Sequence, residues 1–409
     1  MGFPVPEQPW FPQAPVLPVP EGRQVQVATV EELIRAVEQA QPGDVILLQD
    51  GTYYLPRYIE IQEDRVTLRS ASGNRNTVVL DGSQSIHGEL LGFRSCSGVT
   101  VAHITIQNIR WNGFKINSDF NVQNLTIYDC VIHNIWQRGV KSVRIPLENR
   151  EQIRPKNCKV QYCLFYNDRP KRFSDDPSDT PQNFNGDYIG GIDTMFAKGW
   201  IISDNVFTGI KGRTGQGRGC IFMWHHAEDC IIERNIIIDC DFGIALGNSS
   251  GIGEGSSSIH GTNMVVRNNF ITNTPETGIL AAYTTNCKII NNTVHDPDNQ
   301  LRRLIRIVHE NDGLEVRNNL LSGTGVARET NDAIIFENNR IGDYTNYFVA
   351  PEKGNLYLKP EAEQAIDQGE SHPDVTHDID QMPREEPIDL GADEYGNVPE
   401  VSSIQEQVH

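Results

Sequence analysis

The sequence predicts an all-β protein, a right-handed parallel β-helix (solenoid) with a capping helix at its N-terminus. Three observations predict this fold: one asparagine recurs in a repeated phrase, every repeat holds short alternating apolar runs, and an amphipathic segment precedes the first repeat. Self-similarity at a period of about 20–50 residues is typical of solenoids, because each repeat buries its apolar face only against its neighbours.

The repeated phrase is an apolar run, a polar turn and a second apolar run. The asparagine of the turn is Asn205, Asn235, Asn269, Asn292, Asn319 and Asn338, with spacings of 30, 34, 23, 27 and 19 residues. Upstream, the same place is taken by Cys163, Cys130 and Ile104. Such short runs, rich in Val and Ile, indicate strands rather than helices. We expect these asparagines to adopt the αL conformation at a bend between two sheets and to stack in a hydrogen-bonded ladder, with no role in catalysis.

The two ends of the chain differ from the repeats. Residues 1–24 form a Pro-rich arm, residues 25–345 the β-helix with its cap, and residues 346–409 a C-terminal tail or cap. Thr29 and Glu32 have the spacing of a capping box, so a helix is predicted over residues 30–41. An amphipathic helix would cover the open end of the solenoid. We expect the acidic, Pro-rich tail to pack on the last coils or to run back along their side.

Composition limits the function. The chain has 409 residues and a formal net charge of −19, which argues against a nucleic-acid partner. No apolar run approaches the roughly 20 residues that span a bilayer, and the first 20 residues lack the basic start and apolar core of a signal peptide. The eight cysteines show no CxxC spacing, and several occupy interior stack positions, so we expect mostly free, buried thiols. We expect a monomer that binds no membrane.

One strand of each coil can be aligned through a glycine or small residue at its start, as in GFKINSD (113–119), GVKSVRI (139–145) and GIDTMFA (191–197). Because side chains alternate along a strand, the second residue after the start faces outward. The outward column then reads Lys115, Lys141, Asp193, Phe222, Ala245, Leu280 and Arg306. Adjacent coils lie about 4.8 Å apart, so the two lysines and the aspartate would be neighbours, with Trp224 offset along its strand.

A lysine beside an aspartate on this face suits β-elimination from a uronic acid. A base takes the proton next to the carboxylate, a cation stabilises the enediolate, and an acid assists the leaving oxygen. We therefore predict Lys141 and Asp193 as catalytic residues and Lys115 and Trp224 as substrate-binding residues. The alternative is a solvated Lys141–Asp193 pair without chemistry.

Long inserts and further polar residues surround this face. The inserts cover residues 145–157, 168–186, 210–219 and 247–262. The insert 210–219 carries Lys211, Arg213 and Arg218, a candidate subsite for carboxylates or sulfates. His225 is predicted to contact substrate and His226 to carry protons. A further substrate-binding cation is predicted at Arg306.

Two stretches resemble known proteins. VATVEELIRAVEQAQPGDVILLQDGTY (27–53) resembles the N-terminal cap of secreted bacterial β-helix proteins, including the chondroitinase B and alginate lyase group. AIDQG (365–369) followed by DLGADEYG (389–396) resembles a C-terminal signature of exported bacterial β-helix proteins. With the coils, the resemblance covers most of residues 25–396. It implies a polysaccharide substrate, anionic in the lyases, and a secreted or periplasmic location.

The resemblance also implies roles for particular residues. In that group a lysine base and an arginine acid lie near a Ca²⁺ site. Lys141 would be the base, and Arg218 or Arg213 the acid. Asp187 and Asp193 are close in sequence and could share Ca²⁺ with backbone oxygens.

Other functions stay open on the same scaffold, because this fold carries lyases, hydrolases, epimerases and binding proteins. A glycoside hydrolase needs two carboxylates roughly 5–10 Å apart, for which Asp187, Asp193 and Glu276 are the candidates. A C5-epimerase would use the same proton chemistry without loss of a leaving group. A non-catalytic glycan-binding protein would present an aromatic row, for which only Trp224 and Tyr283 are candidates.

Overall fold

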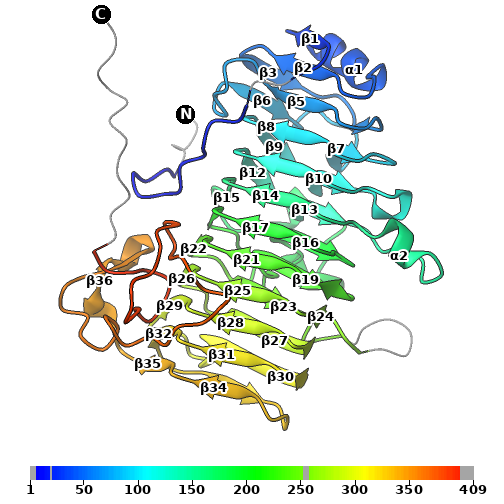
Figure 1. The fold of residues 1–409 in the computed structure, drawn as a ribbon. Coiled ribbons are helices and arrows are strands. Elements are labelled where there is room, and N and C mark those ends of the chain that lie inside the picture. The colour runs from blue at the N-terminus through cyan, green and yellow to red at the C-terminus, as the bar shows by residue number, and fades with distance from the viewer. Residues whose placement is uncertain (1–5, 19–20, 252–257, 397–409) are drawn as a thin grey trace, which may run out of the picture.

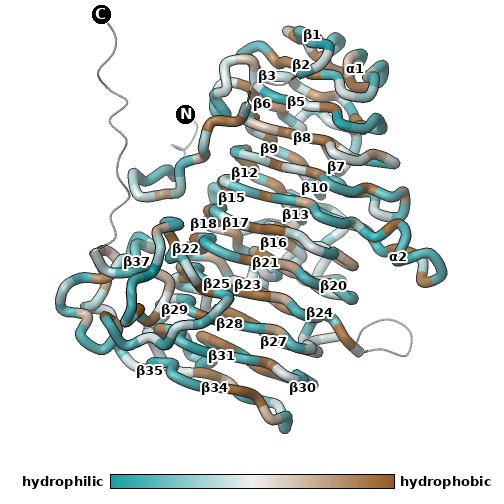
Figure 2. Tube along the Cα trace, viewed as in Figure 1, coloured by the Kyte–Doolittle hydropathy of each residue, from teal (hydrophilic) through white to brown (hydrophobic). Residues whose placement is uncertain are grey.

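The computed structural model describes residues 6–18, 21–251 and 258–396, and over these residues the chain winds into a parallel β-helix (Figure 1). Within the described residues, three all-parallel sheets of 12, 12 and 11 strands run along the axis, so the predicted β-helix is confirmed. Each coil contributes a strand to sheet A, then to sheet B, then to sheet C. Apolar residues recur along the strands from coil to coil (Figure 2).

Sheet A consists of β1 (Gln24–Val27), β2 (Val45–Leu48), β5 (Thr67–Ser70), β8 (Thr100–Ala102), β11 (Thr126–Tyr128), β14 (Lys159–Gln161), β17 (Ile201–Ser203), β21 (Ile231–Glu233), β25 (Val265–Arg267), β28 (Lys288–Ile290), β31 (Glu315–Arg317) and β34 (Ile335–Glu337). Sheet B consists of β3 (Gly51–Tyr54), β6 (Val78–Asp81), β9 (Thr105–Ile109), β12 (Val131–Ile135), β15 (Leu164–Tyr166), β18 (Val206–Thr208), β22 (Ile236–Ile238), β26 (Phe270–Thr272), β29 (Thr293–Asp296), β32 (Leu320–Gly323) and β35 (Arg340–Gly342). Sheet C consists of β4 (Ile59–Ile61), β7 (Glu89–Phe93), β10 (Asn112–Ile116), β13 (Arg138–Ser142), β16 (Gly190–Met195), β19 (Ile221–Trp224), β20 (Ala227–Glu228), β23 (Phe242–Leu246), β24 (Gly261–Thr262), β27 (Thr277–Thr285), β30 (Ile305–Asp312) and β33 (Ala327–Glu329).

Helical elements are short and lie outside the coils. They are α1 (Val30–Glu38), α2 (Arg150–Ile153) and the 3-10 turns η1 (Ser118–Phe120), η2 (Phe173–Asp175), η3 (Phe184–Gly186), η4 (Thr345–Tyr347) and η5 (Pro351–Lys353). A separate antiparallel pair joins β36 (Phe348–Ala350) and β37 (Asn355–Leu358). No helix within the described residues is long and apolar enough to cross a membrane.

The asparagine ladder stands at the corner between sheets A and B. Asn235 donates from Nδ2 to the Ile202 carbonyl of the preceding coil at 2.9 Å, and its Oδ1 accepts from Nδ2 of Asn205 at 3.0 Å. The predicted ladder is therefore confirmed. The predicted αL conformation is wrong by one residue, because the positive φ belongs to the residue before each ladder position, such as Asp204 with φ 61°.

The last rung of the ladder also differs from the prediction by one residue. Asn319 donates from Nδ2 to Oδ1 of Asn339 at 2.8 Å, whereas Asn338 has φ 48° and is the αL residue of that corner. Adjacent αL and ladder positions both favour asparagine, so an Asn-Asn pair does not reveal which residue takes which place.

The helix α1 covers the first coils (Figure 1). Thr29 and Glu32 form the predicted capping box, and α1 ends at Glu38, three residues before the predicted end. Leu33 and Val37 are buried and belong to the main core of the solenoid. Amphipathic helices of this kind protect the apolar end of a strand stack.

The outer face of sheet B is apolar and is covered by both ends of the chain. Phe11 of the N-terminal arm and Phe348 of the tail join one buried cluster with Leu164 and Phe270 of sheet B. The tail then runs back beside the earlier coils, where Gln381 donates to the Tyr162 hydroxyl at 3.0 Å. This confirms the expected path of the tail along the side (Figure 1). All eight cysteines are free and buried, as predicted.

Candidate active site

The predicted outward column lies on sheet C. Lys115, Lys141, Asp193 and Phe222 pair in register on β10, β13, β16 and β19, which confirms the alignment made from the sequence. Phe114 and the residues paired with it point inward and are fully buried. The two lysines and the aspartate are thus consecutive rungs on one face.

Asp193 is the centre of this face. Its side chain is only 2% exposed, and Oδ2 accepts from Lys141 Nζ at 2.8 Å and from Arg138 Nε at 2.9 Å. Oδ1 accepts from Nε1 of Trp224 at 3.0 Å. Burial by itself would raise the pKa of Asp193, but the Lys141 and Arg138 charges and the hydrogen bonds lower that pKa to about 2. Asp193 is therefore ionised across the physiological pH range, and it holds Lys141 in place.

Arg138 was missed by the sequence alignment. It lies directly before Gly139, the first residue of the aligned strand GVKSVRI, so the alignment did not include it. Its side chain is 1% exposed, and the ring of Tyr188 lies 4.1 Å from its guanidinium carbon. A buried arginine next to a buried aspartate forms an ion pair that depends on both partners.

The insert before β16 holds Tyr188 against this face. Lys171 is fully buried and donates from Nζ to Asp176 at 3.1 Å, to Asp179 at 2.8 Å and to the Tyr188 carbonyl at 3.1 Å. Asp179 also accepts from the Tyr188 backbone N–H at 2.9 Å. Trp111, directly before β10, donates from Nε1 to Asp176 at 3.1 Å. The insert is therefore tied to sheet C by a buried charge network.

The three cations of the insert 210–219 have different surroundings. Lys211 pairs with Asp239 at 2.6 Å, and Arg213 donates from Nε to the Asn185 carbonyl at 2.9 Å. The half-buried Arg218 guanidinium has no hydrogen-bond or ion-pair partner among the residues that the structure describes. Burial, and then the charge of Arg138, lowers the pKa of Arg218. Arg218 is thus the cation of this loop that is available to a ligand, next to the Asp193 cluster.

Two of the residues predicted to contact substrate, Lys115 and Arg306, form ion pairs within the protein. Lys115 pairs with Glu89 at 2.6 Å, although it stays beside Lys141 in register. Arg306 donates two hydrogen bonds to the Glu329 carboxylate, each 3.0 Å long. It lies four strands along sheet C from Asp193, a distance of about 19 Å at about 4.8 Å between neighbouring strands. The structure therefore does not bring Arg306 to the Lys141–Asp193 cluster.

The aromatic and histidine residues lie at the far end of β19. The Trp224 ring stacks on His225 at 4.0 Å between centroids. Burial, with the charges of neighbouring histidines and arginines, lowers the pKa of His225 to about 4, so His225 is neutral at neutral pH. His226 follows with φ 60°, and its ring stacks with Phe196 at 6.4 Å. Of these side chains, Trp224 is the one that contacts Asp193.

The insert 247–262 lies over the later rungs of the face, and its residues 252–257 are outside the described part of the chain. Ser249 O accepts from His309 Nε2 at 2.9 Å, and Gly251 O accepts from His260 Nε2 at 2.9 Å. The outward residues Ala245 and Leu280 are buried in an apolar cluster with Phe222 and Val308, against which Trp224 and Tyr283 pack.

Both predicted calcium ligands, Asp187 and Asp193, accept hydrogen bonds from protein groups. Asp193 accepts hydrogen bonds from two cations and an indole, and such donors occupy the lone pairs that a metal would need. Asp187 accepts from the Thr214 N–H at 2.8 Å and from its hydroxyl at 2.5 Å. Within the described residues, the one group of three acidic, Cys or His side chains converging within 4.8 Å is Asp378, Asp380 and Asp393 in the tail.

Comparisons with known proteins identify the fold. No protein-family model matches the chain, and no curated protein matches it. The chain is similar to the crystal structure of the pectate lyase Pel9A, with 14% identity, a TM-score of 0.52, and coverage of 88% of this chain and 89% of that chain. An alginate lyase from Paenibacillus sp. str. FPU-7 matches with 13% identity and a TM-score of 0.42 over 78% of this chain and 99% of that chain. The GH136 lacto-N-biosidase from Eubacterium ramulus matches with 11% identity and a TM-score of 0.49, over 78% of this chain and 68% of that chain. The match to Pel9A shows that the chain resembles this pectate lyase in fold.

Proposed function

We propose that this protein is a polysaccharide lyase, which cleaves a uronic-acid-containing glycan by β-elimination on the outer face of sheet C. The observation that carries the proposal is the Arg218 guanidinium, which has no partner within the described residues and interacts electrostatically with Arg138 and Asp193. In a chain of net charge −19, a cluster of cations around one such group favours an anionic ligand.

Arg218 would bind the carboxylate of the uronate. A guanidinium binds a carboxylate through two parallel hydrogen bonds, which fixes the orientation of the sugar. In the enediolate formed after proton removal, the carboxylate gains negative charge, so the same contact strengthens in the transition state. Arg138, buried beneath, adds a positive charge in a site with little water.

Lys141 would be the base that takes the proton from the carbon next to the carboxylate. Its side chain is 12% exposed, and Asp193 holds its Nζ at 2.8 Å. Asp193 then acts as a positioning residue, because its charge is shared with Arg138. A lysine must be unprotonated to accept a proton, so we expect the rate to rise with pH in the alkaline range.

Tyr188 would donate the proton to the leaving oxygen. Its ring lies over Arg138, and its hydroxyl has no hydrogen-bond partner in the described part of the chain. Arg218 is better suited to hold the carboxylate than to act as the acid that the family resemblance implied, because a guanidinium releases a proton reluctantly. His226 as a proton carrier, and Lys115, His225, Arg213 and Lys211 as more distant contacts, remain predictions.

Three further properties belong to the proposal. A polysaccharide substrate places the enzyme outside the cytoplasm, so we expect a secreted or periplasmic protein that acts as a monomer. Ca²⁺ at Asp187 and Asp193 remains a prediction of the sequence, and no step above depends on it.

The test is a panel of alginate, polygalacturonate and chondroitin sulfate, each with Ca²⁺ and with a chelator. A lyase produces an unsaturated uronate that absorbs in the ultraviolet, and we expect this product from at least one polymer. Reducing ends without unsaturated product would show a hydrolase. Incorporation of solvent deuterium at C5 without chain cleavage would show an epimerase.

Matched variants test the residue roles. Lys141→Ala is expected to lower kcat by at least about 100-fold, the usual contribution of a general base. Lys159→Ala is the control, because Lys159 is exposed on sheet A. Full activity of Lys141→Ala, with the fold retained by circular dichroism, would remove Lys141 from the mechanism.

A further inference from the structure

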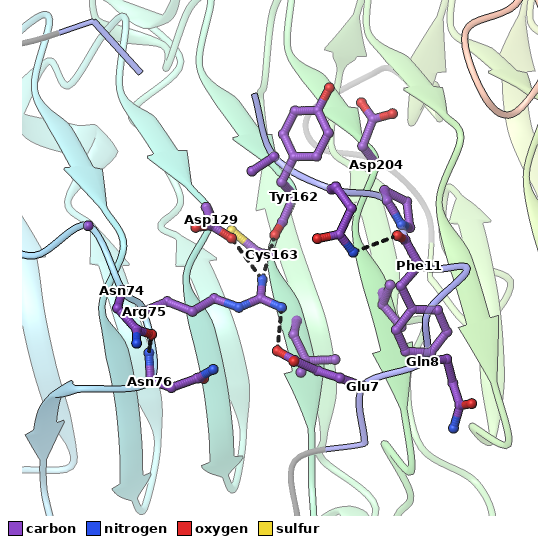
Figure 3. A pocket seen from close by; sticks show the side chains of 16 residues that line it. Glu7, Gln8, Phe11, Asn74, Arg75, Asn76, Asp129, Tyr162, Cys163 and Asp204 are labelled. Atoms are coloured by element: carbon purple, nitrogen blue, oxygen red, sulfur yellow. Dashed lines mark hydrogen bonds and ion pairs between the residues drawn. The ribbon is translucent and has the colours of Figure 1, made fainter. Parts of the chain in front are cut away.

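A cavity lies at the corner between sheets A and B, away from the sheet C face. Its volume is about 360 Å³, within the range of roughly 300–1,000 Å³ for small-molecule pockets. One wall is the N-terminal arm, residues 7–14, and another is the turn 73–76 between β5 and β6. Asp129, Tyr162 and Asp204, three consecutive αL corner residues, line the floor (Figure 3).

The charged side chains that line this cavity are one guanidinium, which is paired within the protein, and three carboxylates. Arg75 pairs with Glu7 at 2.7 Å and with Asp129 at 2.9 Å, and it also donates to the Tyr162 carbonyl at 3.1 Å (Figure 3). Asp204 lies across the cavity and has its own partner outside the lining, Arg234, at 2.8 Å. With three carboxylates and one engaged guanidinium in the lining, the cavity repels an anion.

The same carboxylates do not form a metal site. Asp129 already accepts from Arg75 and from His103 Nδ1 at 2.7 Å. In the described part of the chain, the group with three converging ligand atoms lies in the tail and includes none of these residues. A multivalent cation is therefore not the ligand that this lining fits.

The cavity nevertheless offers many free hydrogen-bonding groups. An ionised carboxylate has about four lone-pair positions, and Asp129 and Glu7 use only some of theirs. Asn74 accepts the Asn76 N–H through Oδ1 at 3.0 Å, which leaves its NH₂ group available. The Asn76 side-chain amide has no partner among the described residues. The Tyr162 hydroxyl accepts from Gln381, so its own hydrogen can be donated.

We propose that this cavity binds a neutral sugar unit. Uncharged hydroxyl groups both donate and accept, so they match a lining of carboxylate acceptors and amide and phenol donors. Phe11 and Tyr162 are the aromatic residues of the lining, and because both are more than nine-tenths buried, the ligand is held mainly by the polar groups. The site is independent of the proposed lyase activity, because it lies on another corner and takes a ligand of another charge.

The experiment is a calorimetric titration of the full chain with glucose, galactose, mannose and N-acetylglucosamine, compared with galacturonate and glucosamine. We expect at least one neutral sugar to bind with a Kd of about 1 mM or below. The titration is repeated in Lys141→Ala, where binding should be unchanged, so the result does not depend on catalysis.

Two variants locate the binding. Asn76→Ala removes an exposed amide, and Glu7→Gln replaces one carboxylate oxygen acceptor of an exposed residue by an NH₂ donor and removes its charge beside Arg75; each should weaken binding about fivefold. Gln300→Ala, which removes an exposed amide at another loop, should leave it unchanged. The proposal is overturned if no neutral sugar binds below about 50 mM. It is also overturned if galacturonate or glucosamine binds more tightly than every neutral sugar, or if both lining variants bind as the wild type does.

Discussion

Replacing Asp193 by Asn tests how far the buried charge cluster depends on one carboxylate. The substitution keeps the shape but leaves Arg138 buried beside Lys141 without a counter-charge. Removing one partner of a buried pair costs about 3–5 kcal/mol. The pKa of Asp193 gives a second figure, because a change from 3.8 to about 2 corresponds to about 2–3 kcal/mol at about 1.4 kcal/mol per unit. Both figures predict a loss of several kcal/mol.

The assay is urea unfolding followed by circular dichroism at pH 7, with Asp193→Asn and the double variant Arg138→Met/Asp193→Asn. The double variant should regain a large part of the loss, because it removes the unpaired buried guanidinium. The folded-state pKa of Asp193 is depressed, so its stabilising contribution is complete above about pH 4 and is lost as the pH falls toward 2. Asp193→Asn should therefore show a weaker acid dependence in that window. A loss below about 1 kcal/mol, as for a surface pair, would refute the reasoning.

Three further predictions concern the loop, the ladder and the tail. Arg218→Ala should raise KM for a uronate polymer at least about tenfold, whereas Arg213→Ala should change it little; equal effects would contradict the assignment of Arg218. Asn269→Ala should lower the free energy of unfolding by about 2–4 kcal/mol, because it leaves buried backbone groups unpaired. Asn339→Ala, at the partly exposed last position of the ladder, should lower it by only about 1 kcal/mol. Equal losses in urea unfolding would argue against the ladder. Burial, with neighbouring carboxylates, raises the pKa of Asp393 to about 8, so the stabilising contribution of the protonated Asp393 is complete below about pH 4 and is lost as the pH rises through 8. Asp393→Asn should flatten the fall in stability between about pH 4 and about pH 8 in thermal unfolding, and an unchanged slope in that window would exclude Asp393 as its source.

The register of the coils could be predicted because it follows from local alternation. Once Phe114 and its equivalents were assigned to the interior, Lys115 and Lys141 had to face outward on adjacent rungs. The last rung was misassigned because Asn338 and Asn339 are chemically identical neighbours. The positive φ of Asn338 and the hydrogen bond from Asn319 to Asn339 distinguish them in the structure.

The polar partners of the loops could not be predicted, because they have no period. Lys211 and Arg213 look equivalent to Arg218 in sequence, but their partners Asp239 and Asn185 come from other parts of the chain. Arg138 carried a weak signal, a charged residue directly before an aligning glycine. Such a residue becomes informative only when its ion pair with Asp193 is known.

The two ends of the chain change how this solenoid should unfold. In a simple repeat array every contact is between neighbours, so coils can fray one after another from an end. Here the Asn291 side chain donates to the carbonyls of Asp389 and Gly391, and Arg75 binds Glu7 of the arm. These contacts join segments distant in sequence and fasten several coils together from outside. Loss of a terminal coil would therefore break contacts elsewhere as well, which couples the array into a single cooperative unit instead of a row of separable ones.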